Sequence, residues 1–215
     1  MQEIIAWVLE HLDYWVITLF MAIESSFIPF PSEVIVPPAA WLASTPGSEL
    51  NIFWVVIFAT IGADIGALFN YYLAVWLGRP IVYAFANSRI GHMCLLDAEK
   101  IEHAENYFKK HGVVSTLVGR LIPAVRQLIS IPAGLAKMHL GKFLLYTTIG
   151  AGLWNTVLAV IGYSLSKVPG LKTKEQVVEK AGEYSHIIGY GLLAILVFVV
   201  IYLVYRASKA PKTAA

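Results

Sequence analysis

Two long apolar stretches of this chain are each interrupted by prolines that stand close to charged residues. The first covers residues 13–44, and its interrupting residues are Glu24, Pro29, Pro31 and Glu33. The second covers residues 113–138, and its interrupting residues are Arg120, Pro123, Arg126, Pro132 and Gly134. A proline inside a helix removes a backbone hydrogen bond and clashes with the preceding turn. We therefore expect each stretch to fold as shorter helical pieces around a break.

The composition indicates that these stretches lie in a membrane. Hydrophobic residues make up 58% of the 215 residues and charged residues only 14%, whereas about a quarter of a typical soluble chain is charged. Backbone polar groups in lipid must be hydrogen-bonded internally, and roughly 20 apolar residues suffice for a spanning helix. The sequence predicts an all-α membrane protein with one polytopic domain over residues 1–215.

The remaining segments differ in polarity. Three apolar runs are predicted to cross the membrane: residues 52–77, 140–166 and 187–205. Residues 78–112 form a polar, amphipathic segment, and residues 206–215 form a basic tail. Within the polar segment, an acidic start at Asp97 and a basic end before Gly112 predict a surface helix.

Lysine and arginine placement predicts the orientation of these segments. No Lys or Arg precedes Arg79, whereas residues 78–112 contain five. Because cytoplasmic loops are enriched in Lys and Arg, this segment and the C-terminal tail are predicted to lie in the cytoplasm. Residues 113–138 must then start and finish on the cytoplasmic side, since 140–166 and 187–205 cross as a pair.

The second interrupted stretch is therefore predicted to be a re-entrant hairpin. The first, 13–44, has no basic residue on either flank, and we interpret it as a second hairpin that enters from the opposite face. A hairpin plus a span thus occurs twice with opposite orientation. Such inverted repeats in transporters place the substrate site near the midplane, where broken helices meet.

The charges in the two hairpins are the candidate site. Ionisable groups at membrane depth usually face a cavity or a pathway. Arg120 and Arg126 carry planar guanidinium groups suited to phosphate oxygens, so they are the candidate phosphate-binding residues. Glu24 and Glu33 are candidates for proton coupling, since burial favours a neutral carboxyl and a nearby arginine favours a charged one. The alternative is that these carboxylates only balance the charge of the arginines.

Other polar residues in the apolar segments are assigned smaller roles. Asp64 lies mid-span and is a candidate for proton coupling or for pairing with one of the arginines. Asn70 and Asn155 are expected to form interhelical hydrogen bonds. Gly62 and Gly66, four residues apart, predict close helix packing.

The two arginines are six residues apart in the second hairpin. That spacing on an ideal helix separates two side chains by about 120°. We therefore expect Arg120 and Arg126 to converge only if Pro123 bends the backbone between them.

Several motifs give the chain a family resemblance. They are Glu24 with Pro29-Phe30-Pro31-Ser32-Glu33, Gly62-Ala63-Asp64-Ile65-Gly66, Gly78-Arg79, Phe108-Lys109-Lys110-His111-Gly112, Gly119-Arg120-Leu121-Ile122-Pro123-Ala124-Val125-Arg126, Pro132-Ala133-Gly134 and Trp154. Over roughly residues 10 to 205 the chain resembles the DedA family, whose members share the VTT or SNARE-associated domain.

The resemblance implies a re-entrant-hairpin fold in the bacterial cytoplasmic (inner) membrane and movement of lipids between leaflets. The implied substrate is undecaprenyl phosphate or a phospholipid such as phosphatidylethanolamine, often with proton dependence. The family's acidic pair falls on Glu24 and Glu33, and its arginine pair on Arg120 and Arg126. Membrane lipids and protons are thus the expected partners, and homo-oligomerisation through residues 187–205 stays open.

Two other function classes fit part of this pattern. An intramembrane lipid-phosphate enzyme would use the same arginines but needs a nucleophile, and neither hairpin contains a histidine; we therefore expect no enzyme and no catalytic residue. A proton-coupled cation antiporter would bind its ion at the carboxylates. The single cysteine and six scattered histidines predict neither a metal site nor a cofactor, and no basic patch with interleaved aromatics predicts a nucleic-acid partner.

Overall fold

The computed structural model of the chain describes residues 2–26, 31–88, 98–122, 125–171 and 173–185, together with Ile187 and Gly191. Every regular element within these ranges is a helix and none is a strand, which confirms the all-α class. Pro29 and Pro123 lie outside the described residues. So do the expected span and tail after residue 187, apart from Gly191.

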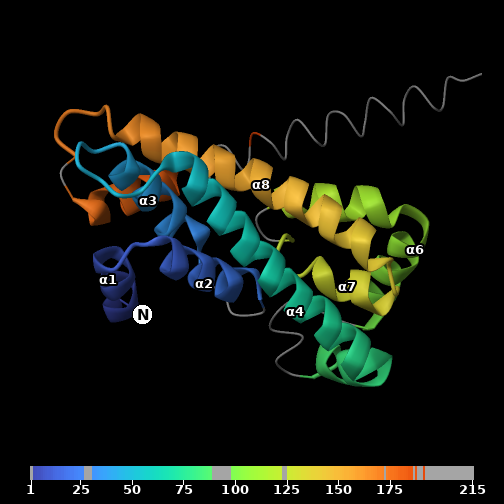
Figure 1. Cartoon of the computed structure of the whole chain (residues 1–215). Coiled ribbons are helices and arrows are strands. Elements are labelled where there is room, and N and C mark those ends of the chain that lie inside the picture. The colour runs from blue at the N-terminus through green and yellow to red at the C-terminus, as the bar shows by residue number, and fades with distance from the viewer. Residues whose placement is uncertain are drawn as a thin grey trace, which may run out of the picture.

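Two long helices, α4 (Ile52–Ala86) and α8 (Leu140–Leu165), run side by side through the molecule (Figure 1). They provide the two helical segments in the described part that are long and apolar enough to cross a membrane. Each carries a stripe of exposed large apolar side chains at helical spacing, a pattern suited to contact with lipid. The stripes are Ile61, Ile65, Phe69, Tyr72 and Trp76 on α4, and Leu145, Ile149, Leu153, Val160 and Tyr163 on α8.

Two helices extend further than the sequence indicates. Helix α4 continues past residue 77 to Ala86 through a kink at Gly78, whose φ of 68° is accessible to glycine. Helix α6 (Ala98–Leu121) runs on through Gly112, so the predicted helix end at that glycine is wrong. Glycine is tolerated inside a helix at a cost of about 1 kcal/mol, and Thr116 Oγ1 donates a hydrogen bond of 2.7 Å to the Gly112 carbonyl.

The first interrupted stretch contains three short elements: α2 (Tyr14–Ser25), the 3₁₀ turn η1 (Ser32–Val34) and α3 (Val36–Ala43). Asp13 caps α2 by accepting a hydrogen bond of 2.7 Å from the Val16 backbone N–H. Pro37 and Pro38 lie in the first turn of α3, where a missing N–H is tolerated. An additional helix that the sequence did not predict, α1 (Gln2–Glu10), precedes them.

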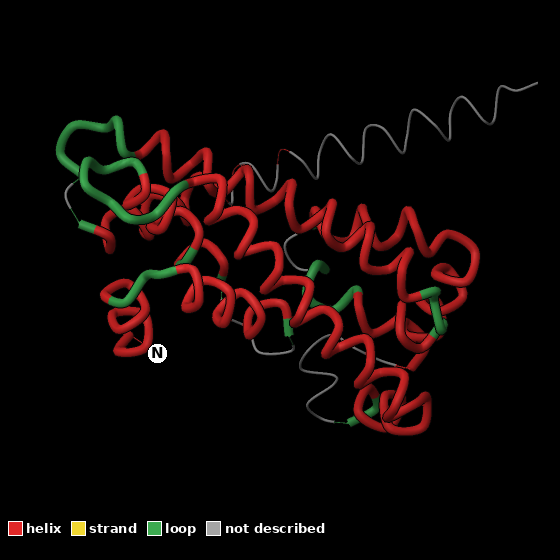
Figure 2. The backbone as a smooth tube through the Cα atoms, viewed as in Figure 1, coloured by secondary structure: helices red, strands yellow, loops and turns green. Residues whose placement is uncertain are grey.

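The second stretch contains the end of α6, a series of turns over residues 125–129, and helix α7 (Ser130–Leu135). The turns lie inside the bundle rather than at its ends (Figure 2). Pro132 and Gly134, which the sequence assigned to the break, both lie within α7.

The packing of the short helices on the long ones alternates between the two halves. Helix α2 packs on α4 and α6 on α8, whereas α3 packs on α8 and α7 on α4. A Cβ on Gly62 or Gly66 would overlap the α2 backbone at Thr18 or Ala22, which confirms the predicted close packing. One buried apolar cluster joins α1, α2, α3, α4 and α8, and a second joins α4, α6, α7 and α8.

Candidate functional site

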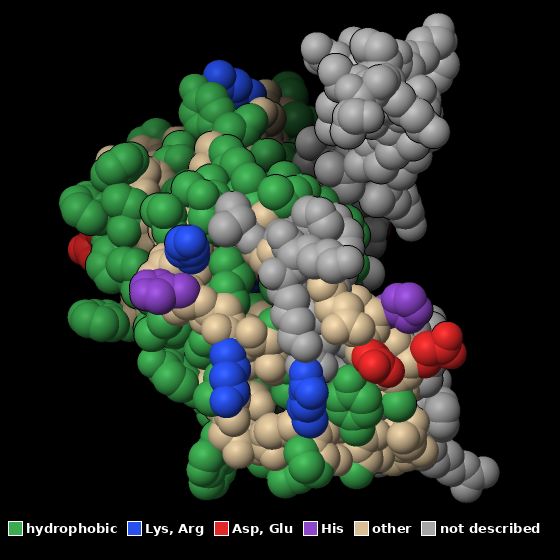
Figure 3. All heavy atoms as spheres, turned by 90° about the vertical axis from the view of Figure 1, so that its right-hand side faces the viewer, with side chains coloured by type: hydrophobic (Ala, Val, Ile, Leu, Met, Phe, Trp, Pro, Cys, Tyr) green, Lys and Arg blue, Asp and Glu red, His purple; other side chains and the backbone are tan. Residues whose placement is uncertain are grey.

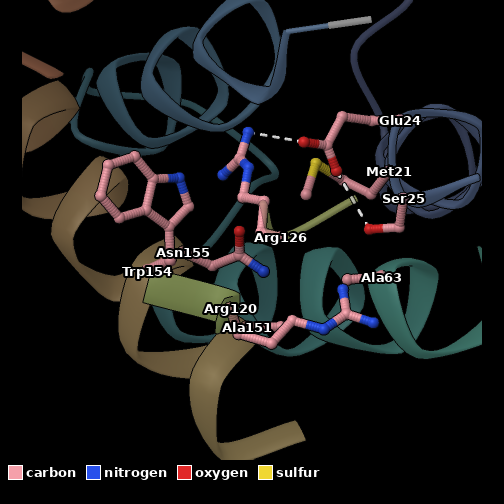
Figure 4. Close-up of a pocket in the computed structure, with 9 residues that line it drawn as sticks. All are labelled: Met21, Glu24, Ser25, Ala63, Arg120, Arg126, Ala151, Trp154 and Asn155. Atoms are coloured by element: carbon pink, nitrogen blue, oxygen red, sulfur yellow. Dashed lines mark hydrogen bonds and ion pairs between the residues drawn. The ribbon is translucent and has the colours of Figure 1, made fainter. Parts of the chain in front are cut away.

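The end of α2 and the turns after α6 bring a carboxylate and a guanidinium together in the protein interior. Glu24 in the last turn of α2 is 2% exposed, and Arg126 after α6 is 8% exposed. Glu24 Oε1 and Arg126 Nη2 are 2.5 Å apart and form an ion pair (Figure 4). Ser25 Oγ donates a hydrogen bond of 3.0 Å to the other carboxylate oxygen of Glu24.

Two further groups surround the Arg126 guanidinium. Arg126 Nη2 donates a hydrogen bond of 2.7 Å to the hydroxyl of Ser32, a buried residue of η1. The indole ring of Trp154 on α8 lies on another side, with its centroid 5.2 Å from the guanidinium carbon, within range of a cation–π interaction. Arg126 thus joins α2, η1 and α8.

Arg120 has a different environment. It lies in the last turn of α6, is 3% exposed, and donates a hydrogen bond of 3.0 Å from Nη2 to Ser130 Oγ at the start of α7. Among the described residues, no carboxylate lies within ion-pair distance of this guanidinium. Arg120 is therefore a buried cation whose nearest partner is a neutral hydroxyl.

A small cavity of about 10 Å³ separates these groups. The residues that line it are Met21, Glu24, Ser25, Ala63, Arg120, Arg126, Ala151, Trp154 and Asn155 (Figure 4). Three buried N–H groups in this lining have no acceptor in the described part of the chain: Arg120 Nε, Arg126 Nε and Trp154 Nε1. Buried donors are normally hydrogen-bonded, so this set is suited to an anion.

Glycine and asparagine residues hold the surrounding helices in place. A Cβ on Gly150 of α8 would lie 2.6 Å from the Arg120 Cβ, so the absent side chain makes room for the arginine. Asn70 Nδ2 donates to the carbonyls of Ser25 and Gln127, and Asn155 Nδ2 donates to Thr60 Oγ1. The predicted interhelical roles of both asparagines are confirmed.

The other sequence-predicted residues lie apart from the cavity. Glu33 is half-buried and accepts a long hydrogen bond of 3.5 Å from Ser32, which links it to Arg126 through one hydroxyl. Asp64 Oδ2 accepts a hydrogen bond of 2.7 Å from Thr148 on α8. Asp64 forms no ion pair with either arginine within the described residues.

Sequence reasoning missed three residues of this site. Ser32 and Trp154 entered only through the family resemblance, and Ser130 carries no signal in the sequence. A tryptophan in the middle of a span, away from the interfaces that the residue usually occupies, is the one signal that points to such a role. Among the described residues, no group of three His, Cys, Asp or Glu side chains is arranged to hold a metal ion.

Comparison with known proteins gives the family. Residues 30–164 match the VTT domain, and no solved structure matches the chain. The chain is 38% identical over 204 residues to an alkaline phosphatase-like protein of Lactococcus lactis subsp. lactis (strain IL1403), covering 93% of this chain and 92% of that protein. It is 32% identical over 171 residues to undecaprenyl phosphate transporter A of Staphylococcus aureus (strain NCTC 8325 / PS 47), covering 80% and 83%.

The similarity extends to the protein after which the family is named. Protein DedA of Escherichia coli (strain K12) is 28% identical to the chain over 159 residues, which cover 73% of this chain and 70% of that protein. The domain match covers more than half of the chain, and the two long apolar helices agree with a membrane location. The chain therefore belongs to the DedA family of VTT-domain membrane proteins.

Proposed function

We propose that the chain moves a lipid with a phosphate-bearing headgroup between the leaflets of the membrane, and that Arg120 and Arg126 contact the phosphate. The observation that carries this proposal is the set of three buried N–H donors without an acceptor around the small cavity. A phosphate offers several acceptor oxygens, and hydrogen bonds to a charged acceptor are stronger than neutral ones. Two guanidinium groups match its negative charge.

Undecaprenyl phosphate is our leading candidate for the substrate, with phosphatidylethanolamine as the alternative. Two relatives are named undecaprenyl phosphate transporter A, one from Staphylococcus aureus and one from Bacillus subtilis. A terminal phosphate monoester exposes more charge and more oxygens than a phosphodiester, and would therefore engage both arginines better.

Transport in this proposal requires the site to open. A cavity of about 10 Å³ has room for roughly one water molecule and none for a phosphate group. The incoming phosphate would displace Glu24 from Arg126, because both anions compete for the same guanidinium. Binding of the headgroup therefore breaks the ion pair between Glu24 and Arg126.

We propose that this displacement couples transport to protons. A buried carboxylate that loses its arginine partner is destabilised in the charged form and takes up a proton. Ser32 accepts from Arg126 and donates to Glu33, so Glu33 is suited to exchange protons with Glu24 as the site opens. Asp64 is bonded to Thr148 and has a lesser part in this scheme.

We propose a re-entrant topology for residues 13–44 and 113–138 in an inverted repeat. Helices α2 and α3, of 12 and 8 residues, are about 18 Å and 12 Å long, less than the roughly 30 Å of the hydrocarbon core. The alternating packing of α2 and α7 on α4, and of α6 and α3 on α8, supports two related halves. We place the protein in the inner membrane with its C-terminus in the cytoplasm.

Two competing functions make different predictions. A lipid-phosphate phosphatase is prompted by the name of the Lactococcus relative and requires release of inorganic phosphate. A proton-coupled cation antiporter uses the carboxylates and needs only a positive charge at Arg126. Under our proposal Arg126→Lys loses most activity, because an ammonium group lacks the planar fork that binds two phosphate oxygens.

The deciding experiment is reconstitution of the purified protein into liposomes that contain fluorescent undecaprenyl phosphate or phosphatidylethanolamine. Leaflet exchange is measured for the wild type, for Arg126→Lys, and for Lys142→Gln, which changes an exposed basic residue on α8. We expect exchange by the wild type and the control but not by Arg126→Lys, with faster exchange under a proton gradient. Absence of exchange by the wild type, or release of inorganic phosphate, would reject the proposal.

A further inference from the structure

A second and much larger cavity lies between α4 and the end of α7. Its volume is about 540 Å³, within the range of roughly 300–1,000 Å³ typical of small-ligand sites. The residues that line it are Ala74, Val75, Gly78, Arg79, Pro80, Gly134, Leu135, Ala136 and Lys137. We call it the α4–α7 groove. It shares no lining residue with the cavity between Arg120 and Arg126.

The groove begins where the backbones of α4 and α7 separate. A Cβ on Gly134 would lie 2.5 Å from the Tyr71 carbonyl oxygen and 2.9 Å from the Ala74 Cβ, so α7 and α4 touch at that level. Beyond the contact, α4 changes direction at Gly78, with a φ of 68°. The chain after α7 turns at Lys137, with a left-handed φ of 51°. The two walls therefore diverge where both backbones leave helical geometry.

The lining combines two cations with an apolar surface. Arg79 and Lys137 are both exposed, and none of the nine lining residues is a carboxylate. Most of the remaining wall is aliphatic, including Val75 and Leu135. Figure 3 shows this end of the molecule, with described Lys and Arg side chains in its lower half and acidic side chains to the right of them. Such a surface is complementary to a ligand with an anionic head and an apolar chain.

Exposed aromatic and apolar residues place the groove at the edge of the membrane. Trp76, two residues before the kink in α4, is 85% exposed, and Tyr72 and Ile81 are also exposed. Trp and Tyr concentrate at the boundary between hydrocarbon and headgroups. Arg79 follows Trp76 by three residues and therefore lies at headgroup depth, where basic pockets between helices bind anionic lipid heads.

We propose that the α4–α7 groove binds an anionic phospholipid of the surrounding membrane, with Arg79 and Lys137 on its phosphate and the aliphatic wall against an acyl chain. Helix α7 connects this groove to the cavity between Arg120 and Arg126. Ser130 at its start accepts a hydrogen bond from Arg120, and Leu135 at its end lines the groove. Six helical residues span about 9 Å. The binding does not depend on the transport activity proposed above.

The test measures lipid binding to full-length protein in nanodiscs of phosphatidylcholine with a minor fraction of phosphatidylglycerol. Native mass spectrometry counts the retained phosphatidylglycerol for the wild type, for the variant with Arg79→Gln and Lys137→Gln together, and for each single change. Lys142→Gln is the matched control, because it removes one exposed basic residue that does not line the groove. Inorganic phosphate is added in a parallel arm.

We expect the wild type to prefer phosphatidylglycerol to phosphatidylcholine and the double variant to bind it about 30-fold more weakly, at roughly 1 kcal/mol for each basic residue. Each single change should weaken phosphatidylglycerol binding about 5-fold. The single variants therefore decide the test if the double variant does not fold. The control Lys142→Gln should keep wild-type affinity. Equal loss in the control, absence of lipid preference, or displacement by inorganic phosphate would overturn the proposal.

Discussion

Arg126 and Arg120 line the same cavity, yet the protein surrounds them very differently. Arg126 has an ion pair with Glu24, a hydrogen bond to Ser32 and the ring of Trp154 beside it. Arg120 is more deeply buried but has only the hydroxyl of Ser130 as a close partner among the described residues. The charge of Arg126 is compensated by its neighbours. The charge of Arg120 is not, so a neutral side chain at that position would cost less desolvation free energy.

Because of this difference, the two arginines are expected to contribute differently to stability and to transport. Removing one partner of a buried ion pair leaves an uncompensated charge and is strongly destabilising, whereas removing a buried charge that has no ionic partner also removes its desolvation cost. We therefore expect Arg126 variants to affect both folding and transport, and Arg120 variants to affect mainly transport.

The largest effect on stability is expected when Arg126 loses its charge. Arg126→Leu leaves Glu24 buried and unpaired, which should lower the free energy of unfolding by about 3–5 kcal/mol. Adding Glu24→Gln should restore at least half of that loss, because no buried charge then remains at the pair. A double-mutant cycle by reversible unfolding in detergent measures both values.

The recovery in the doubly changed variant is the check on this explanation. If Glu24→Gln restores no stability to Arg126→Leu, the loss comes from altered packing at position 126 and not from an unpaired buried charge.

Arg120 should show the opposite balance. Arg120→Met keeps an unbranched apolar stem and removes the charge, so the free energy of unfolding should change by no more than about 1 kcal/mol, in either direction. Lipid exchange should fall about 100-fold, since hydrogen bonds to a charged group are worth roughly 1.5–3 kcal/mol. A thermal melt in detergent and the liposome assay are measured on the same preparation. A large loss of stability would show that Arg120 is a structural cation like Arg126.

The neighbouring glycines of α8 test whether the position of Arg120 matters. Gly150→Ala introduces a Cβ that would lie 2.6 Å from the Arg120 Cβ, whereas a Cβ on Gly152 lies 3.8 Å from Thr60 in ordinary contact. Overpacking at Gly150 should cost about 1–3 kcal/mol of stability and reduce exchange. Gly152→Ala is the matched control and should be nearly neutral in both assays.

The fold follows from the sequence where the signal is local. Interruption by proline and charge gives the break after α2, and apolar length gives α4 and α8 as helices over the expected stretches. The end of α6 could not be read locally, because Gly112 and the basic residues before it are an end signal that the continuing helix overrides. Helix α1 was not predicted because Val8 and Leu9 are ordered by packing against distant helices.

The candidate site shows the same division. Charges at membrane depth are visible in a sequence, so Glu24, Arg120 and Arg126 could be selected as candidates before their geometry was known. Their neutral partners were not visible, because a serine at depth is not costly and carries no signal. The contact between Arg126 and Ser32 joins residues 94 positions apart, and only tertiary structure creates it.

A smaller effect is expected at Trp154, which stands beside Arg126 and whose indole N–H has no acceptor in the described part of the chain. Trp154→Phe keeps an aromatic ring near the guanidinium and removes only the donor. Stability should stay close to wild type, whereas the apparent affinity for the phosphate-bearing lipid should fall about 10-fold, at the low end of a hydrogen bond to a charged group. The concentration dependence of exchange provides this number, and unchanged affinity would remove Trp154 from the proposed phosphate contacts.

The smallest effect is expected at Asp64, the one sequence-predicted carboxylate that is bonded to the opposite long helix. Its side chain accepts a hydrogen bond from Thr148, and Asp64→Asn retains an oxygen that can accept the same bond. Because a neutral hydrogen bond contributes about 0.5–1.5 kcal/mol, we expect exchange within about twofold of wild type for Asp64→Asn and for the matched variant Thr148→Val. The liposome assay under a proton gradient distinguishes this outcome from direct coupling. If Asp64→Asn abolishes the response to the gradient while Glu24→Gln does not, Asp64 carries the proton and the ion pair between Glu24 and Arg126 only balances charge.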